Sequence, residues 1–368
     1  MKIKISISII VLFIAAIFFT AAKVDDGFGA YAPTPIKLKI PEGWPKPTND
    51  IFAKNKLTEQ GFELGRKLFY DGRLSKDGEV SCASCHQQFA SFATFDHDLS
   101  HGVNNTLSTR NAPALINLAW MTGLHWDGGV NHIEVQPLSP ITAANEMGEK
   151  LDSIIFKLKQ DSSYKRMFKA AFGDPLINSQ RMLKALSQYT GSLISCNSKY
   201  DKVMRGEASF NHYEQNGYNV FKAKCAGCHK EPLFTDNSYR NNGLPLNRFN
   251  DIGRQKITND PKDSLKFKVP TLRNVQVSFP YTHDGHIFSL YQVVEHYRTG
   301  IVTSQPTLDS LLKNRITVTP KEKNDLVYFL YTLTDSSFIK DPRFGPPMYY
   351  SGPNIISKKP AHVEPVRQ

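Results

Sequence analysis

Two copies of one pentapeptide, C-x-x-C-H, constrain this 368-residue chain more than any other feature. They lie at 82–86 (CASCH) and at 225–229 (CAGCH). Two Cys at i and i+3 on a helical turn can each form a thioether bond to one haem, and the adjacent His can bind its iron. Each copy therefore predicts a covalently attached c-type haem. The predicted attachment residues are Cys82, Cys85 and His86 in the first copy and Cys225, Cys228 and His229 in the second.

Two other uses of paired Cys agree less well with the sequence. Structural zinc sites usually take their Cys pairs from positions much closer together than 82/85 and 225/228. A thioredoxin-type redox pair would lie in a βαβ pattern, and no such pattern surrounds either copy. Five Cys are too few for a disulfide scaffold, and we expect Cys196, which lies outside the motifs, to be a buried inert thiol.

The composition is that of an ordinary globular protein, with 40% hydrophobic and 21% charged residues. It excludes long disorder and a multi-span membrane protein. The formal charge of +11 suits an acidic partner protein or an anionic surface, and it equally suits a soluble protein without such a partner. Aromatic and basic residues are not interleaved as in nucleic-acid readers, so we expect no nucleic-acid partner.

The N-terminus has the pattern of an export signal. Lys2 and Lys4 precede an apolar run that closes on small residues at Ala22, and Asp25 follows it. Cleavage after Ala22 would release the protein into the periplasm. Because the run approaches the length that spans a bilayer, an uncleaved N-terminal anchor is the alternative. Both interpretations place the folded part outside the cytoplasm.

We expect two domains with shorter flanking segments. The predicted parts are a signal peptide (1–22), a Pro-rich leader (23–48), an N-terminal haem domain (49–205), a C-terminal haem domain (206–345) and a tail (346–368). A weak internal repeat supports two domains, because G-x-x-L-F at 65–69 precedes the first motif and G-x-x-V-F at 217–221 precedes the second.

Apolar periodicity predicts a mainly α-helical fold. A helix is predicted to begin near Thr58, and residues 149–205 carry the most extensive i, i+3, i+4 spacing. A last helix is predicted over 321–333, and alternation typical of strands is scarce. Together with the motifs, this pattern predicts two cytochrome c-like domains, each with one covalent haem.

Further segments occur in an order typical of one family. They are LGRKLFYDGRLSKDGEVSCASCH, RNAPALINLAW, HWDGG, FKVPTLRNV and PYTHDG, and they lie between 49 and 342. With them the chain resembles the bacterial di-haem cytochrome c peroxidases, a family that also contains the methylamine-utilisation protein MauG. The resemblance implies that the N-terminal haem reacts with hydrogen peroxide. It also implies that the C-terminal haem receives electrons from a small cytochrome c or cupredoxin, and a homodimer is among the expected assemblies.

The resemblance assigns the peroxide chemistry to the segment HWDGGVNHIEVQPLSPITAANEMGE. Gln136 and Glu146 match a distal glutamine and glutamate of the family, and Trp126 matches a tryptophan between the haems. A carboxylate in a mostly apolar pocket can move a proton between the two peroxide oxygens, first as a base and then as an acid. Taken alone, Gln136 and Glu146 would more often be surface or capping groups, and Trp126 would be core.

Each iron has two candidate residues for its second axial position. His101 matches a histidine that caps the N-terminal haem in many resting peroxidases, and His97 is the alternative. If neither binds, that haem is always open, as in MauG. At the second haem, Tyr297 falls where well-studied peroxidases have Met, and the adjacent His296 competes with it. A phenolate lowers the potential of the iron and a thioether raises it, while a merely buried Tyr297 is the remaining interpretation.

The resemblance also implies a calcium ion between the domains. Asn111 matches a side chain that binds the ion, and Ser278 and Pro280 match residues that offer backbone carbonyls. Amide, carbonyl and water oxygens suit such a hard cation.

Three functions are consistent with these residues. The first is a cytochrome c peroxidase-type oxidoreductase that reduces hydrogen peroxide to water. The second is a MauG-like oxidase of a protein or organic substrate, acting through a Tyr-ligated second haem. The third is a plain electron-transfer protein with both irons six-coordinate. Trp occurs only at 44, 120 and 126, none of them near Cys225 in the sequence, so the sequence does not support long-range oxidation of a protein substrate.

Overall fold

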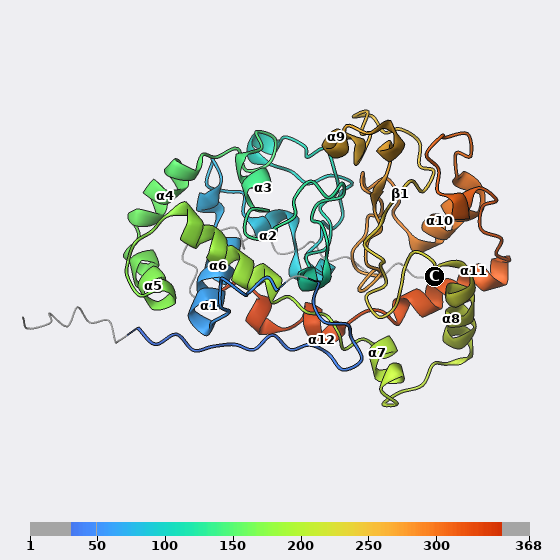
Figure 1. Cartoon of the computed structure of the whole chain (residues 1–368), viewed down its shortest axis with the longest axis horizontal. Coiled ribbons are helices and arrows are strands. Elements are labelled where there is room, and N and C mark those ends of the chain that lie inside the picture. Colours follow the sequence, from blue (N-terminus) through green and yellow to red (C-terminus); the bar gives the residue numbers. More distant parts are fainter. Residues whose placement is uncertain (1–30, 49, 348–368) are drawn as a thin grey trace, which may run out of the picture.

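Short helices form most of the regular structure in the computed structural model, which describes residues 31–48 and 50–347. They are arranged in two lobes along the long axis of the molecule, with the N-terminal half of the chain in one lobe and most of the C-terminal half in the other (Figure 1). The predicted signal peptide (1–22), the start of the leader and all but the first two residues of the predicted tail lie outside the described residues.

Before residue 205 the α-helices are α1 (Glu59–Phe69), α2 (Cys82–Cys85), α3 (Leu138–Thr142), α4 (Leu151–Lys159), α5 (Ser162–Phe172), α6 (Ser179–Gly191) and α7 (Lys199–Met204). Those of the C-terminal half are α8 (His212–Lys224), α9 (Gln255–Thr258), α10 (Leu290–Glu295), α11 (Pro320–Tyr331) and α12 (Ser336–Ile339). The strands β1 (Tyr239–Arg240) and β2 (Phe267–Lys268) pair antiparallel, with Tyr239 opposite Lys268.

Several one-turn helices complete the regular structure. The 3₁₀ turns are Gly72–Leu74, Gln88–Ala90, Val103–Asn105, Leu118–Trp120, Pro261–Asp263, Ser310–Leu312 and Pro342–Phe344, and His296–Gly300 is a π-helix. The prediction of a mainly helical chain with few strands is therefore confirmed. Among the described residues, none of these helices is long and apolar enough to cross a membrane.

Helix ends follow local capping chemistry. The Thr58 side chain accepts a hydrogen bond from the Gly61 amide, so α1 begins where the sequence predicts. A capping box of Thr319 and Glu322 starts α11, which begins one residue before the predicted 321–333 helix and ends at Tyr331. Gly173, at a φ of 94°, ends α5 in the left-handed conformation that glycine tolerates best.

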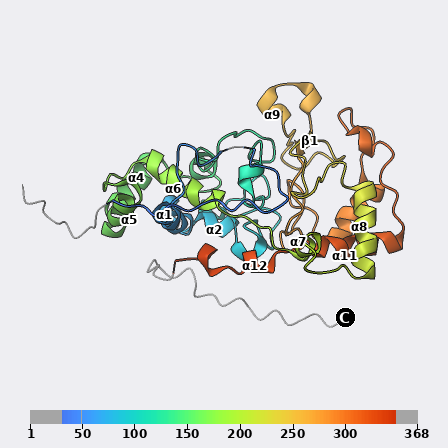
Figure 2. The ribbon, with the colours of Figure 1, turned by 60° about the horizontal axis from the view of Figure 1, so that its bottom comes forward.

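Each lobe has its own apolar core. Leu68, Phe92 and Tyr189 belong to the first core, and Phe221 and Phe329 belong to the second. The chain passes between the lobes twice, once before α7 and once after α11. Tyr200 of α7 packs into the second core, whereas Phe338 of α12 and Phe344 pack into the first. Figures 1 and 2 accordingly show α12 beneath the N-terminal lobe, although it follows α11 of the other lobe.

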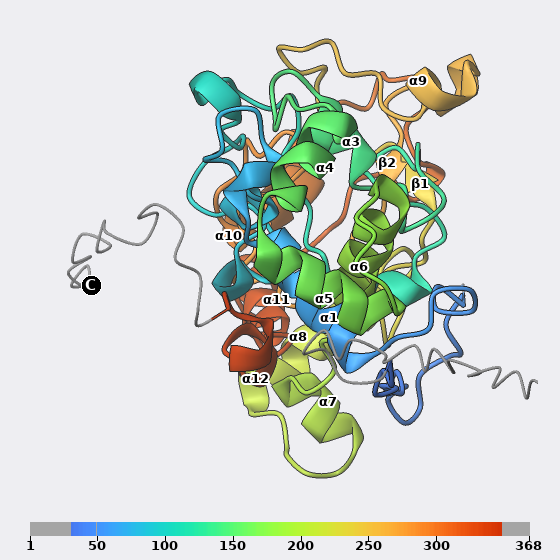
Figure 3. The same ribbon diagram turned by 90° about the vertical axis from the view of Figure 1, so that its left-hand side faces the viewer.

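Each lobe contains a pair of helices that meet at a glycine. A Cβ on Gly65 of α1 would overlap the backbone carbonyl of Ala185 in α6. A Cβ on Gly217 of α8 would overlap the backbone carbonyl of Asp325 in α11 in the same way. These glycines are those of the internal sequence repeat, so the repeat marks the two places where helices pack backbone to backbone. Figure 3 shows α6 crossing α1 at the end of the first lobe, with α4 and α5 beside them.

The described part of the Pro-rich leader connects the two lobes. Trp44 packs edge-to-face against Trp120 of the first lobe, with ring centroids 5.1 Å apart. On the side of the second lobe, the guanidinium carbon of Arg273 lies 4.4 Å from the centre of the Trp44 ring. The Trp120 indole also donates a hydrogen bond of 2.8 Å to the Pro45 carbonyl. This leader therefore covers the junction between the lobes.

The glycine at the second helix crossing supplies a test of the packing. We expect Gly217→Ala to destabilise the protein by about 1–3 kcal/mol, because the added methyl group must push α8 away from α11. Thermal unfolding followed by circular dichroism measures the effect. Gln215→Ala, at an exposed position of the same helix, is the matched control. Equal melting temperatures for the two variants would contradict this account of the crossing.

Candidate active site

Both C-x-x-C-H motifs line one cavity, with a volume of about 840 Å³, that extends through the junction of the lobes. The motif residues in its wall are Cys82, Cys85, His86, Cys225, Cys228 and His229. The rest of the wall is predominantly apolar, with a few titratable side chains from each lobe. This cavity therefore joins two attachment sites that are 143 positions apart in the sequence, counted from Cys82 to Cys225.

The first motif places a neutral imidazole in the cavity wall. Cys82 and Cys85 bound the single turn of α2, and His86 follows directly. Nδ1 of His86 lies 2.7 Å from the carbonyl oxygen of Phe92. A proton on Nδ1 donated to this carbonyl leaves Nε2 free as a metal ligand. Burial lowers the pKa of His86 to about 4, which keeps the ring uncharged at neutral pH.

The second motif repeats this arrangement at the end of α8. Nδ1 of His229 lies 3.1 Å from the Phe234 carbonyl and 3.2 Å from the Pro270 carbonyl, and burial lowers the pKa of the ring. Burial also raises the pKa of the Cys82 and Cys225 thiols to about 12, so neither is a ready thiolate ligand for a metal ion. Paired neutral thiols beside an oriented imidazole fit a covalently attached haem in each lobe.

Glu146 lies in the cavity wall on the side of the first motif. Its backbone is fixed by two hydrogen bonds, from its own amide to Ala143 and from the Val103 amide to its carbonyl. Burial raises the pKa of the Glu146 carboxyl, and the same carboxyl contributes to raising the pKa of the Cys85 thiol. The carboxyl group is therefore near the first attachment site, in surroundings that favour its protonated form.

Gln136 and His125 form a pair in the same wall. The Gln136 amide nitrogen lies 3.4 Å from Nε2 of His125, and both side chains line the cavity. His125 was not predicted from the sequence as a site residue, although it begins the HWDGG segment. A single His carries no specific signal by itself. In the structure the His125 ring lies in the cavity wall, and the His125 backbone has a φ of 64°, in the left-handed region.

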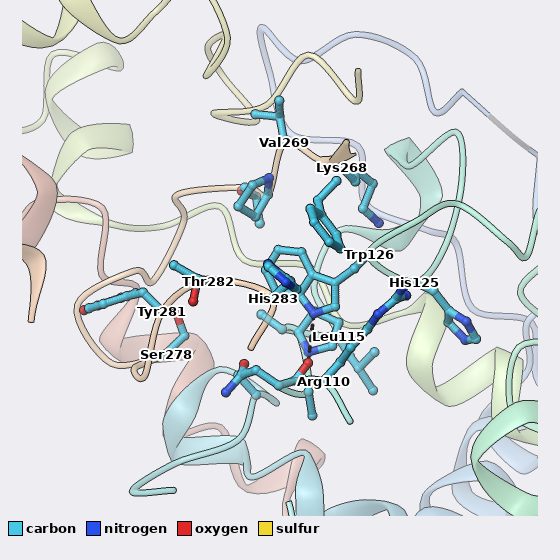
Figure 4. A pocket seen from close by; sticks show the side chains of 18 of the residues that line it. Arg110, Leu115, His125, Trp126, Lys268, Val269, Ser278, Tyr281, Thr282 and His283 are labelled. Carbon is cyan, nitrogen blue, oxygen red and sulfur yellow. Dashed lines mark hydrogen bonds between the residues drawn. The ribbon is translucent and has the colours of Figure 1, made fainter. Parts of the chain in front are cut away.

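Trp126 lies where the two lobes meet. Its indole nitrogen donates a hydrogen bond of 2.8 Å to the Asn111 carbonyl, and its own carbonyl accepts 2.7 Å from the Lys268 amide of β2. Figure 4 shows the indole beside His283, with Lys268 and His125 on one side and Tyr281 on the other. Trp126 is thus held through its indole by the first lobe and through its backbone by the second, in the wall of the cavity that both motifs share.

His283 is a second buried histidine at this junction. It stacks on Phe267 with ring centroids 3.7 Å apart, and its Nε2 accepts from the Asn247 amide at 3.3 Å. Burial lowers its pKa to about 4, so it remains neutral. His283 was not predicted from the sequence as a site residue, and no signal in the sequence indicated its stacking partner.

Arg110 holds the HWDGG segment against the second lobe. Its guanidinium donates to Asp127 of that segment at 2.5 Å and to Asp251 of the second lobe at 2.6 and 2.9 Å. The Arg110 charge keeps the pKa of Asp251 well below its usual range. Arg254 donates to the Asp127 backbone carbonyl at 2.9 Å, so two arginines fix the chain beside Trp126.

The two histidines considered for the first iron lie on the surface. His101 is exposed and its Nδ1 lies 2.6 Å from the side-chain oxygen of Asn105. His97 is exposed as well and packs edge-to-face on His101, with centroids 5.1 Å apart. Neither ring lines the cavity that contains His86.

The two residues considered for the second iron differ in their contacts. Tyr297 lines the cavity close to Cys225 and Cys228, and burial raises its pKa to about 12. His296 also lines the cavity, but its Nε2 lies 3.0 Å from the Asn242 carbonyl. Both belong to the π-helix His296–Gly300, a rare element that often marks functional positions.

The residues matched to a calcium site also lie in the cavity wall at the junction. They are Asn111, Ser278 and Pro280. Asn111 is buried, its backbone amide donates to the His283 carbonyl at 2.8 Å, and its side-chain amide donates to the Asp98 carbonyl at 3.2 Å. Within residues 31–48 and 50–347 no cluster of three or more His, Cys, Asp or Glu could hold a metal ion.

Comparisons with known proteins agree with this geometry. Residues 59–209 match the family model of the di-haem cytochrome c peroxidases. MauG of Methylorubrum extorquens is 34% identical over 303 residues, which cover 81% of this chain and 83% of that protein. The chain belongs to the di-haem cytochrome c peroxidase family, which includes MauG.

Relatives in this family are named either MauG or cytochrome c peroxidase. The cytochrome c551 peroxidase of Nitrosomonas europaea is 33% identical over 290 residues, covering 74% of this chain and 79% of that protein. Among solved structures, a MauG-like protein associated with microbial copper homeostasis superposes with a TM-score of 0.78 at 32% identity, covering 85% of this chain and 99% of that chain. The family resemblance seen in the sequence is confirmed, and the family is one of di-haem oxidoreductases.

Membership of a di-haem family gives a direct test of the two attachment sites. We expect the protein to carry two covalent haems that survive denaturation, and Cys82→Ala/Cys85→Ala to carry one, because the thioether bonds of the first lobe cannot form. Haem staining of denaturing gels and intact mass measure this. Cys196→Ala is the control, since this half-buried thiol lies outside both motifs and should leave both haems in place. Loss of a haem from the control would contradict the assignment.

Proposed function

We propose that this protein is an exported di-haem peroxidase that reduces hydrogen peroxide to water with electrons from a small redox protein. Each lobe would hold one haem c, with iron bound by His86 in the first lobe and His229 in the second. The observation that carries the proposal is the position of Glu146, a half-buried carboxyl in the cavity wall beside the first attachment site. The N-terminal export pattern supports a periplasmic location.

Glu146 would move the proton that the reaction requires. When bound, the first haem would supply an iron to which peroxide can bind, and it would also supply electrons for cleavage of the peroxide O–O bond. Cleavage into water requires a proton to pass from the inner to the outer oxygen of the peroxide. The Glu146 carboxylate accepts that proton and returns it to the departing oxygen. Gln136, held next to His125, orients the peroxide through its amide group.

Trp126 is proposed to pass electrons from the second lobe to the first. Its hydrogen bonds to Asn111 and Lys268 fix the ring and its backbone between the lobes, so the indole needs no rearrangement to serve both sides. We further propose a calcium ion near Asn111, Ser278 and Pro280, which line the cavity from both lobes and carry the amide and carbonyl oxygens that suit such an ion. Such an ion would stabilise the junction that positions Trp126.

A MauG-like oxidase is the second candidate function, and the position of Tyr297 favours it. A phenolate at the second iron would lower its potential, as expected for an oxidase that holds oxidising equivalents. His296 competes less well because its Nε2 contacts the Asn242 carbonyl. In addition, Trp44 packs against Arg273 of the second lobe, so a tryptophan does lie beside that lobe despite its distance from Cys225 in the sequence.

A plain electron-transfer role has less support. That role requires a second side-chain ligand at both irons, and His101 and His97 both lie outside the cavity wall. Their surface positions support a first haem that is open to peroxide.

The peroxidase proposal predicts the behaviour of a Glu146→Gln variant. We expect peroxide turnover to fall by about 100-fold or more, because glutamine cannot accept the proton. The haem absorption spectra should stay unchanged, since glutamine fills the same space. Steady-state peroxide consumption with a reduced cytochrome c measures the loss. A fully active variant would contradict the mechanism.

The same residue predicts a pH dependence. Burial disfavours the charged form of Glu146, so its pKa is raised above the ordinary value of 4.5. Because the reaction needs the carboxylate, kcat/KM for peroxide should decline as the pH falls through that raised pKa. In Glu146→Gln this acidic limb should disappear. If the acidic limb persists in Glu146→Gln, another group is responsible for it and the prediction is wrong.

The second iron can be tested through Tyr297. We expect Tyr297→Phe to change the spectrum of one haem and raise its potential, because loss of a phenolate removes stabilisation of the ferric state. Redox titration followed by absorption spectroscopy measures this. His296→Phe is the matched control and should leave the potential nearly unchanged. A larger shift in the control than in Tyr297→Phe would identify His296 as the ligand.

A further inference from the structure

The cavity reaches solvent beside the second motif. Leu311 lines the cavity and is 58% exposed, an unusual position for a large apolar side chain. A Cβ on the exposed Gly227 would lie 3.6 Å from Cδ1 of Leu311, so this leucine covers the loop of the motif. Lys224, at the end of α8, also lines the cavity and is exposed. The second attachment site therefore lies directly under an apolar spot on the surface.

Exposed basic side chains occur in the segments next to this spot. We call five exposed side chains in the segments that flank Leu311 and the second motif the cationic rim: Lys222, Lys224, Lys230, Lys313 and Arg315. None of the five forms a salt bridge with another described residue. Two nearby acids, Asp236 and Asp309, are both paired with Arg240. Glu231 accepts hydrogen bonds from Tyr200 and Tyr218, and Glu322 interacts electrostatically with Lys224, so two acids face the five cations of these segments. The rim therefore has an excess of positive charge.

The sequence around the first motif is less basic. Residues 80–93, which contain that motif, include no Lys, Arg, Asp or Glu, whereas residues 222–230 around the second motif include three Lys. The exposed apolar side chain in the first segment, Phe89, therefore has no charged neighbour within that segment. The +11 charge of the whole chain acts in the same direction as the charges around the second motif.

We propose that Leu311 and the cationic rim form the docking surface for a small acidic redox protein whose prosthetic group lies under an apolar patch ringed by carboxylates. This inference rests on the proposed function and names the class of its electron donor. Electron-transfer complexes bury little area, and they combine an apolar centre with a charged edge. Opposite charges speed the encounter, which matters for a complex that must form and dissociate at every turnover.

The test compares two charge-reversal variants of the holoprotein. Lys224→Glu/Lys313→Glu reverses two charges of the rim. Lys159→Glu/Lys165→Glu makes the same change on α4 and α5, at exposed positions at the far end of the first lobe. The donors are a reduced acidic cytochrome c, a reduced basic mitochondrial-type cytochrome c and ascorbate with a small organic mediator. Turnover of peroxide is measured with each donor at low and at high ionic strength.

We expect the rim variant to lose about ten-fold in kcat/KM for the acidic cytochrome at low salt, because the encounter rate depends on opposite charges. The loss should shrink at about 1 M salt, where the Debye length is about 3 Å. The far-lobe variant should match the unchanged protein. Leu311→Ser keeps all charges, and its kcat/KM for the acidic cytochrome should fall at both salt concentrations.

The outcomes separate this inference from the proposed function. If the rim and far-lobe variants are equal with the acidic cytochrome, or if the basic cytochrome is the better donor to the unchanged protein, the docking surface is wrong. Turnover with the small mediator should be the same in all variants. If the unchanged protein does not consume peroxide even with the mediator, the proposed function itself is wrong.

Discussion

The ion pairs of Arg110 are the interaction on which the site depends most. One guanidinium joins Asp127, next to Trp126, to Asp251 of the other lobe. Both carboxylates are buried, so removal of the arginine would leave two charges without their main partner, a change that typically costs about 3–5 kcal/mol for a buried pair. Because Trp126 and the two motifs share one cavity only while the lobes stay together, this cluster sets the geometry of the whole site.

Local features of the fold could be predicted from the sequence because they depend on neighbouring residues. The Thr58 cap and the helical spacing of 149–205 act within one or two turns, and the structure has helices there. The repeated glycines also carried real information, since Gly65 and Gly217 both lie at helix crossings. The family could be predicted from the two motifs together with the order of several further segments, because a single motif is common to many haem proteins.

Long-range contacts could not be predicted in this way. The sequence does not indicate that Trp44 meets Arg273, that α12 returns to the first core, or that His283 stacks on Phe267. These pairs arise from the way separate segments pack, and no local pattern encodes them. His125 illustrates the same limit within the site. Its backbone turns into the left-handed region, and this turn decides that its ring meets Gln136.

The interior of the cavity and its opening near Leu311 differ in how far water is excluded from their side chains. Inside, burial keeps His86 and His283 neutral and raises the pKa of Glu146, whereas the charge of Arg110 is held in ion pairs with two carboxylates. An unpaired charge placed there would lose its hydration without a compensating partner. Around Leu311 the opposite holds, because charges in water cost little and act over several ångströms on an approaching partner. The proposed function requires both environments, because electrons would enter at the surface and protons would move in the interior, and the cavity between the lobes connects the two.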